Sequence, residues 1–398
     1  MADAILDAKA SFLIALARAL HEAGAPAHRL EDAVDRAARA LRVPFDCLSQ
    51  PTSLILGVGG TTRVLRVHPA PIHLGRLVAI EAVGVEVSRG ATSPEVALEQ
   101  LAAIASAPER FPTWVFGLAT GVSSAAAAVF LQANPAGVAA AGALGLGVGL
   151  LARLERIVPG YARIHLLAAS FAAAAAATAL AREVPLSVPT LTLAALIGLL
   201  PGLSLTTALT ELATGHLASG TARATGAAVT FLQLGLGTSF GWQVSVLLPR
   251  ALRAAPDPLP PWAPWAALPI AAAAFALTFR ARRRDFPAIA LVSALAYFAA
   301  TQGRLHAGPA MGAAVGGLVV GLASNLQARI RRVPTAVTQV PALLLLVPGS
   351  IGFTGFGALL DDNVTAGIGA TTSMLIIAGS LVAGILAAGV LLPPRRGA

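Results

Sequence analysis

The stretch LIGLLPGLSLTTALTELATGH, residues 196–216, places the pair Pro201-Gly202 inside an otherwise apolar segment. Proline removes a backbone hydrogen-bond donor and glycine permits unusual torsion angles, so the pair predicts a helix that is broken near its middle. Within a bilayer, the carbonyl groups freed by such a break need a polar partner or a water-filled cavity. The pair therefore indicates either a broken helix that lines a pathway or a kink used for helix packing, since both residues are common in membrane helices.

The same pattern returns 147 residues later, where Leu199-Leu200-Pro201-Gly202 is matched by Leu346-Val347-Pro348-Gly349. Six further identities follow at this offset: Thr207 with Thr354, Leu212 with Leu359, Gly220 with Gly367, Thr225 with Thr372, Leu234 with Leu381 and Gly237 with Gly384. The offset also relates the first five apolar segments to the last five. Because five is odd, the second copy must enter the membrane from the opposite side. The pattern predicts a 5+5 inverted repeat, an architecture of secondary transporters with the substrate site between the halves.

The composition restricts the chain to the membrane class. Of 398 residues, 56% are apolar and only 12% are charged, whereas an ordinary soluble protein carries about 25% charged residues. A soluble surface of this size could not be covered by so few charges. High hydrophobicity excludes a disordered chain, and the single Cys47, in a β-like stretch, excludes a disulfide-stapled one.

Ten apolar segments predict membrane helices, and most reach the ~20 residues that a bilayer core requires. The predicted ranges are 113–133, 136–152, 163–181, 187–209, 224–248, 262–279, 286–302, 308–327, 335–355 and 369–391. Their many alanines and glycines favour close helix packing.

The charges divide the chain in two. Residues 1–111 hold 11 basic and 12 acidic residues, whereas residues 112–398 hold 17 basic and 7 acidic ones. The surplus arginines lie between apolar segments rather than on one contiguous surface, which argues against a nucleic-acid partner despite the sequence pI of 11.3. Thirteen of them fall on the side shared by both termini: Arg153, Arg156, Arg163, Arg223, Arg280, Arg282, Arg283, Arg284, Arg329, Arg331, Arg332, Arg395 and Arg396. Four fall on the other side: Arg182, Arg250, Arg253 and Arg304. The positive-inside rule therefore predicts that both termini are cytoplasmic.

The first 111 residues predict a small soluble α+β domain. Helical periodicity covers 5–20 and 27–41, and two β-type runs at 52–58 and 61–67 flank a Gly59-Gly60 turn, which indicates a hairpin. Further helices are expected at 73–88 and 94–106. The predicted fold is an α-helical polytopic membrane protein with this cytoplasmic α+β domain at 1–111, a first half at 112–255 and a second half at 256–398.

Three carboxylates follow the two Pro-Gly pairs. Glu211 comes ten residues after Pro201, and Asp361 and Asp362 occupy the equivalent region after Pro348. Ionisable residues in or near a bilayer are costly, so we interpret these as candidates to carry protons or to hold a substrate ammonium group. The alternative is that they are ordinary loop acids. The sequence contains no phosphate-binding loop, no metal-ligand spacing and no catalytic constellation, so we expect no enzyme activity, no metal and no cofactor.

Several motifs resemble the threonine/serine exporter family (ThrE). The segment 24–34, GAPAHRLEDAV, is similar to the family's N-terminal signature, as are 51–55, PTSLI, and 72–77, IHLGRL. Pro201-Gly202 followed by Thr207, Glu211, Gly215, Gly220 and Arg223 resembles its central stretch, and the region from Pro341 to Gly349 resembles its C-terminal half. These motifs occur in the family's order over essentially the whole chain.

The resemblance implies a soluble N-terminal domain followed by ten membrane helices in the bacterial cytoplasmic membrane. It further implies proton-driven export of threonine and serine. Some relatives are split into two polypeptides near the middle, for which dicarboxylate export has been suggested. This chain has Thr207 and Glu211 where an asparagine and an aspartate are usual, so the identity of the substrate is open.

Together these interpretations predict an alternating-access exporter of small polar amino acids. The breaks at Pro201-Gly202 and Pro348-Gly349 would surround the substrate, the hydroxyls of Ser204 and Thr207 would bind it, and Glu211 would respond to protons. The expected partners are the amino-acid substrate, protons and the lipid bilayer, with a homo-oligomer left open. Two alternatives remain: a dicarboxylate such as succinate as substrate, and a membrane sensor that signals through residues 1–111.

Overall fold

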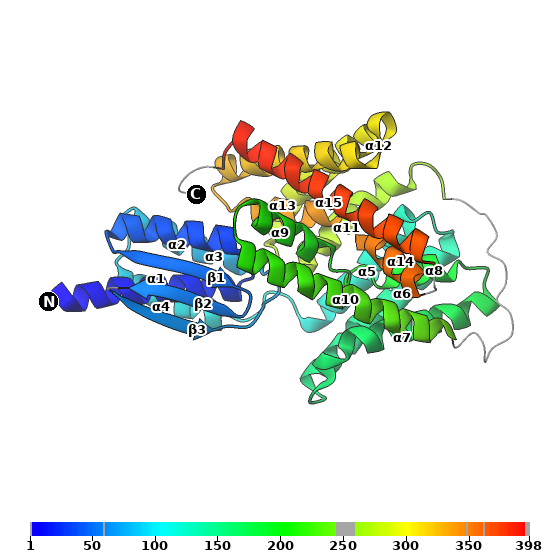
Figure 1. Cartoon of the computed structure of the whole chain (residues 1–398), viewed down its shortest axis with the longest axis horizontal. Coiled ribbons are helices and arrows are strands. Elements are labelled where there is room, and N and C mark those ends of the chain that lie inside the picture. Colours follow the sequence, from blue (N-terminus) through cyan, green and yellow to red (C-terminus); the bar gives the residue numbers. More distant parts are fainter. Residues whose placement is uncertain (1, 59, 244–258, 348, 361–362, 395–398) are drawn as a thin grey trace.

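The computed structural model describes residues 2–58, 60–243, 259–347, 349–360 and 363–394. A small α+β region formed by residues 2–106 lies at one end of an elongated molecule, and helices fill the rest (Figure 1). Asp361, Asp362 and Pro348 lie outside the described residues. Ten membrane spans are discussed below against the helices that the described part contains.

The N-terminal α+β region contains the elements that periodicity predicts. Its helices are α1 (Ala2–Glu22), α2 (Ala27–Leu41), α3 (Leu74–Ser88) and α4 (Pro94–Ser106). The strands β1 (Phe45–Gln50), β2 (Ser53–Val58) and β3 (Thr61–Arg66) form one antiparallel sheet in the order β1-β2-β3. The predicted hairpin is therefore confirmed as β2–β3, with Ser53 opposite Arg66 and Val58 opposite Thr61. Cys47 lies on β1 and is half-buried.

One apolar core joins this region to the helices that follow it. Phe12, Leu16 and Leu54 are buried in the same cluster as Ala276 and Ile289, which come from the far half of the chain. The backbone N–H groups of Leu74 and Gly75 donate to the carbonyls of Phe279 and Arg280, at 2.9 and 3.1 Å. The N-terminal region is thus packed against the helical region and is not a domain on a free linker.

The helical region consists of long apolar helices and pairs of shorter ones. The α-helices are α5 (Thr113–Phe130), α6 (Pro135–Leu151), α7 (His165–Glu183), α8 (Val188–Ala195), α9 (Gly202–Ala213), α10 (Leu217–Gln243), α11 (Ala263–Thr278), α12 (Phe286–Arg331), α13 (Ala336–Leu344), α14 (Gly349–Leu360) and α15 (Val364–Leu391). Short 3-10 helices lie at η1 (Ala152–Arg156), η2 (Tyr161–Arg163) and η4 (Arg283–Asp285).

The count of membrane spans is smaller than ten when length and composition are applied strictly. Among the described residues, four helical segments qualify: Pro135–Glu155, His165–Glu183, Arg283–Arg331 and Val364–Leu391. A fifth is counted if the bent pair Ala336–Leu344 and Gly349–Leu360 is taken as one span. The chain is therefore a mostly helical membrane protein with four to five candidate spans. Trp114–Phe130 and Ala263–Thr278 are apolar but shorter.

Two of the predicted segments, 286–302 and 308–327, are joined in α12. Its backbone leaves helical geometry at Ala307 and Gly308, and Gly308 has φ +83°, a torsion angle that glycine adopts without strain. A Cβ on Gly303 would lie 2.9 Å from the Cα of Gly312, so the two arms approach closely across this turn. The element thus consists of two helices that are joined by a tight reversal.

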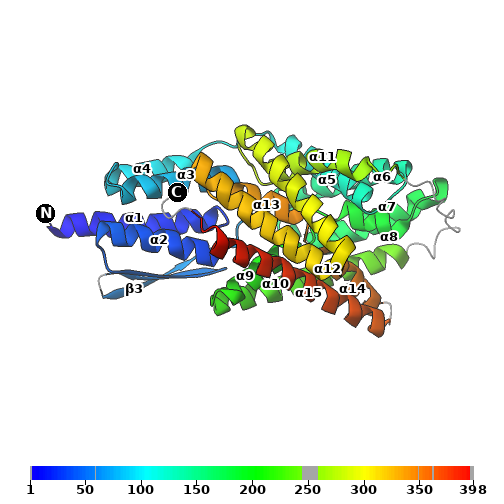
Figure 2. The ribbon, with the colours of Figure 1, turned by 90° about the horizontal axis from the view of Figure 1, so that it is seen from above.

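The element order after residue 113 repeats. The bounds of α9 and α14 differ by 147 residues at both ends, and α10 and α15 begin 147 residues apart. The packing repeats as well, because a Cβ on Gly220 would meet Leu212 at 2.7 Å and one on Gly367 would meet Leu359 at 2.4 Å. In Figures 1 and 2, α10 begins beside the N-terminal region whereas α15 ends near it, so the two helices run in opposite directions.

Candidate functional site

Both Pro-Gly pairs coincide with breaks between short helices. The first pair separates α8 from α9, and Pro201 has φ −80° and ψ 30°, outside helical geometry. The second lies between α13 and α14, whose axes differ by 41°. The sequence prediction of broken helices is confirmed at both places, whereas the single helices predicted over 187–209 and 335–355 are each divided in two.

The two breaks lie against each other. A Cβ on Gly202 would be 2.2 Å from Cγ1 of Val347 and 3.2 Å from the Cα of Gly349. A Cβ on Gly349 would be 3.3 Å from the Cβ of Leu200. Only glycine permits this approach without displacement of neighbouring atoms. The first N–H groups of α9 and α14, which have no acceptor within their own helices, are therefore brought to one place, which we call the break crossing (Leu200–Gly202 with Val347 and Gly349).

The hydroxyl groups on α9 point in different directions. Ser204 is exposed and Thr207 is half-buried, whereas Thr206 is buried and donates to the carbonyl of Gly202 at 3.1 Å. Thr210 continues the ladder by donating to the carbonyl of Thr206 at 2.9 Å. The hydroxyl nearest to the protein interior at this break is thus Thr206, a residue that the sequence reasoning passed over.

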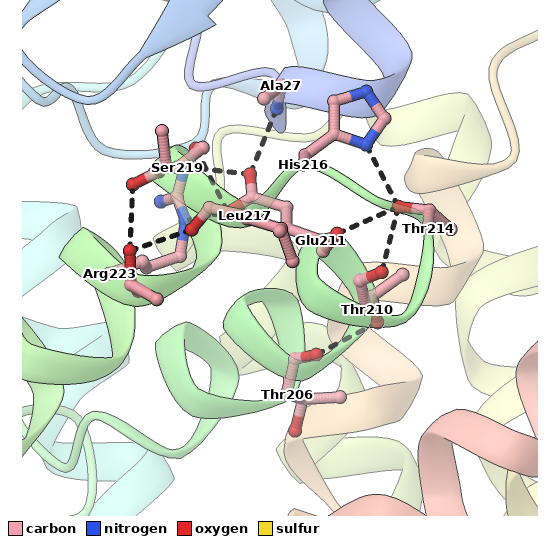
Figure 3. Close-up of polar contacts among 11 residues, drawn as sticks. Ala27, Thr206, Thr210, Glu211, Thr214, His216, Leu217, Ser219 and Arg223 are labelled. Carbon is pink, nitrogen blue, oxygen red and sulfur yellow. Dashed lines mark hydrogen bonds and ion pairs between the residues drawn. The ribbon is translucent and has the colours of Figure 1, made fainter.

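A capped turn ends α9 and reverses the chain. Gly215 has φ +86°, and its N–H donates to the carbonyl of Leu212 while that of His216 donates to the carbonyl of Glu211, at 3.2 and 2.8 Å. This is the Schellman arrangement, in which a left-handed glycine satisfies the last carbonyl groups of a helix. The reversal brings the first turns of α10 back alongside the end of α9, so Ser219 and Arg223 face Glu211 (Figure 3).

Glu211 is fully buried, and its carboxylate accepts four hydrogen bonds. Arg223 donates through Nε and Nη2 at 3.1 and 3.2 Å, and the hydroxyl of Ser219 donates at 3.1 Å. The fourth donor is the backbone N–H of Ala27, the first residue of α2, at 3.0 Å. Since Pro26 offers no side-chain cap of its own, Glu211 supplies the acidic cap that a helix N-terminus favours. We call Glu211, Ser219, Arg223 and His216 the α2 docking cluster.

A second contact of this cluster joins His216 to α2. Nε2 of His216 lies 3.2 Å from Oε2 of Glu31, whose other oxygen accepts the N–H of Ser49 at 2.7 Å. The ring of His28 lies edge-on to that of His216, with centroids 6.0 Å apart. Burial lowers the pKa of His28 to about 3, and burial also raises the pKa of Glu31, against the opposing effect of the Ser49 N–H and His216. His28 is therefore neutral in the folded protein near neutral pH.

The docking cluster is separate from the break crossing. Nine residues of α9 separate Glu211 from Gly202, which corresponds to about 14 Å along a helix axis. Glu211 thus lies at the end of α9 that faces the N-terminal region, whereas Pro201, Gly202 and Gly349 meet at the other end. The sequence reasoning placed all of them at one site, and the structure divides them between two.

The docking cluster has no counterpart in the second copy of the repeat. At the offset of 147 residues, Glu211 corresponds to Ala358 and Arg223 to Ala370. The equivalent of His216 is Asn363, which caps α15 through the N–H of Ala366 at 3.2 Å. The pair Glu211–Arg223 therefore serves something that only the first copy touches, and that neighbour is α2.

Arg223 is the functional residue whose role the sequence did not show. It counted among the loop arginines, because twelve residues separate it from Glu211 and no helical spacing links them. The signal that could have found it is Gly215, since a glycine just after a helix allows the chain to fold back on itself. The metal and cofactor expectations concern binding partners, and among the described residues no group of three or more metal-ligating side chains is found.

Comparisons with known proteins give a consistent family. A family model described as "Putative threonine/serine exporter" matches residues 11–245, and a second, "Threonine/Serine exporter, ThrE", matches 265–391. Two similar relatives are named pheromone-regulated membrane protein 10. The one from Eremothecium gossypii is 24% identical over 85% of this chain and 48% of its own length. The one from Kluyveromyces lactis is 24% identical over 89% of this chain and 40% of its own. The chain thus spans less than half of these relatives, and no solved structure matches it.

Proposed function

The chain belongs to the threonine/serine exporter family, a family of membrane transporters rather than enzymes, and on this premise we propose that it exports threonine, serine and similar small polar amino acids across the cytoplasmic membrane. The observation that carries the proposal is the break crossing, at which two interrupted segments from different halves of the chain meet at Gly202 and Gly349. Interrupted helices at corresponding places in two halves are a mark of secondary transporters.

The proposed architecture is ten spans in two inverted halves. Each half would contain four continuous spans and one broken one, with α8–α9 in the first half and α13–α14 in the second. The shared offset of the element bounds and the opposite directions of α10 and α15 support this arrangement. Rocking of one half against the other would then open the break crossing to each side in turn, which is alternating access.

The proposed substrate site is the break crossing itself. The positive ends of α9 and α14 favour an anion there, so the carboxylate of an amino acid would bind to the N–H groups that follow Pro201-Gly202 and Pro348-Gly349. The hydroxyls of Ser204 and Thr207 would serve the polar substrate side chain as α9 turns during transport. A dicarboxylate would offer a second negative charge in place of the ammonium group.

The proposed proton-responsive group is Glu211. Protonation would remove the charge that holds Arg223 and would weaken the cap on Ala27, so the state of one carboxylate would set the contact between α2 and the helical region. Asp361 and Asp362 remain proposed carriers in the second half. The arginine distribution favours both termini, and with them the N-terminal region, in the cytoplasm.

The decisive experiment loads cells with a threonine-containing dipeptide and follows the threonine that appears outside, with and without this protein and a protonophore. We expect efflux that depends on both the protein and the proton gradient. Labelled succinate in parallel distinguishes a dicarboxylate exporter. Efflux that is identical in cells lacking the protein would overturn the proposal.

The role of Glu211 is tested in the same assay with Glu211→Gln, with flux divided by the amount of protein in the membrane. Reduced flux that no longer follows the pH gradient is expected. If this variant retained full gradient-driven efflux per molecule, the carboxylate would not be the proton-responsive group.

A further inference from the structure

A basic cleft lies where the N-terminal region meets the helical region, away from both the break crossing and the α2 docking cluster. Its volume is about 590 Å³. One wall is the face of α3 that carries Val78, Ala79 and Ala82, and the others are Arg110, which follows α4, and Arg283 and Arg284 of η4. Three separate stretches of the chain thus converge on one cavity.

The acidic groups near this cleft are already occupied by other arginines. Asp285 is buried and accepts from the buried Arg282 at 2.7 Å. Glu109 lies 3.3 Å from Arg280 and 3.8 Å from Arg76. No carboxylate in the described part of the chain lies within ion-pair distance of Arg110, Arg283 or Arg284. The cleft therefore carries positive charge that the protein itself does not neutralise.

The other lining of the cleft is apolar and lies near the start of the first membrane helix. The guanidinium of Arg283 is over the ring of Phe111, 5.6 Å from its centroid. Three residues further on, Trp114 is 58% exposed at the beginning of α5. Exposed tryptophans at helix ends lie at the level of lipid headgroups. Val78, Ala79 and Ala82 then offer an apolar surface beside the arginines at that same level.

We propose that this cleft binds a phosphate group that carries net negative charge, with Arg110, Arg283 and Arg284 as its ligands. Guanidinium groups suit phosphate because their donors match two of its oxygens at once. The two sources of such a group at this position are the headgroup of an anionic phospholipid and a soluble phosphate. The apolar wall and Trp114 favour the lipid, because basic pockets at the cytoplasmic face of membrane helices bind anionic headgroups. Some of the arginines that set the orientation would thus also bind a ligand.

The test uses the full-length purified protein in detergent with phosphatidylcholine, titrated with dioleoyl-phosphatidylglycerol. Thermal melting and native mass spectrometry report binding. In a second arm, inorganic phosphate replaces the lipid. The variant R110Q/R283Q/R284Q removes the three charges, and R42Q/R63Q/R66Q is the matched control, since these arginines are exposed on the N-terminal region. Ala82→Trp fills the cleft from an exposed helical position and keeps every charge.

Wild type and the control are expected to bind phosphatidylglycerol in preference to phosphatidylcholine. The triple variant and Ala82→Trp should each bind it at least tenfold more weakly, since each arginine near an anionic surface contributes about fivefold. If inorganic phosphate rather than lipid shows this dependence, the cleft binds a soluble phosphate. If the triple variant does not fold, Ala82→Trp alone decides. Equal binding of both lipids with no effect of phosphate, or binding that neither variant weakens, would overturn the proposal.

Discussion

The α2 docking cluster makes a prediction about Glu211→Gln that is independent of transport. The glutamine can still accept the N–H of Ala27, but it leaves the guanidinium of Arg223 without its carboxylate. Removal of one partner of a buried pair costs about 3–5 kcal/mol. Because the Arg223 side chain remains 30% exposed, water can solvate part of the freed charge, and we expect a loss of about 2 kcal/mol. The protein should melt about 3 °C or more below wild type.

The assay is a double-mutant cycle of Glu211→Gln with Arg223→Gln, measured as unfolding of the purified protein. We expect a coupling energy of about 2 kcal/mol. The exposed pair Arg18–Glu22, whose side chains are 62% and 51% exposed, is the matched control and should couple by no more than about 0.5 kcal/mol. Hydrogen exchange of peptides around Ala27 should also accelerate in Glu211→Gln. Additive single effects at Glu211 and Arg223 would refute the reasoning.

Three further predictions concern other residues. Gly202→Val should lower both melting temperature and flux because its Cβ would lie 2.2 Å from Val347, whereas Gly226→Ala, with no atom within 4 Å, should be neutral or slightly stabilising in the same measurements. Because the unfolded chain takes up a proton on His28 below its ordinary pKa of 6.5 and the folded protein does so only near about 3, stability should fall as the pH drops through this range, by up to about 1.4 kcal/mol per unit. Denaturation at pH 5 and pH 7 should show a smaller difference in His28→Asn; an unchanged difference would contradict the assignment. Cys47, whose pKa burial raises to about 12, should react with iodoacetamide at pH 8 at least tenfold more slowly than a free thiol, and equal rates in a mass-spectrometric assay would be inconsistent with its placement.

Much of the fold follows from local sequence signals. Periodicity predicts the helices of the N-terminal region and the β2–β3 hairpin, because these patterns report directly which face of an element is buried. The Pro-Gly pairs predict the breaks because proline and glycine act on the backbone at their own positions. The number of spans is harder to predict, since composition does not show whether an apolar run such as 188–213 is one long helix or two short ones.

The division of the predicted site into two follows from contacts that sequence does not carry. Glu211 attracted attention because it is an acid in an apolar setting, and that reasoning is sound as far as its burial is concerned. Its partners, however, come from α2, 184 residues away in the chain, and from Arg223 across the Gly215 turn. Local patterns cannot show a contact between Ala27 and Glu211. The only sequence trace is that Ala358 and Ala370 replace the pair in the second copy, which marks it as specific to the first.

The N-terminal region touches both halves of the helical region, and the two contacts differ in kind. Towards the second half, it shares an apolar core with Ala276 and Ile289 and donates two backbone hydrogen bonds to Phe279 and Arg280. Towards the first half, it relies on the carboxylate of Glu211 and the pair His216–Glu31. If the halves move relative to each other, one contact must open. Opening the apolar one would expose a continuous core to water, at about 25 cal/mol per Å², whereas the polar one needs only a change of charge at a single carboxylate. The N-terminal region should therefore move with the second half, and the Glu211 contact should be the one that opens. Faster exchange around Ala27 in Glu211→Gln, with no change around Leu74, is what this argument requires.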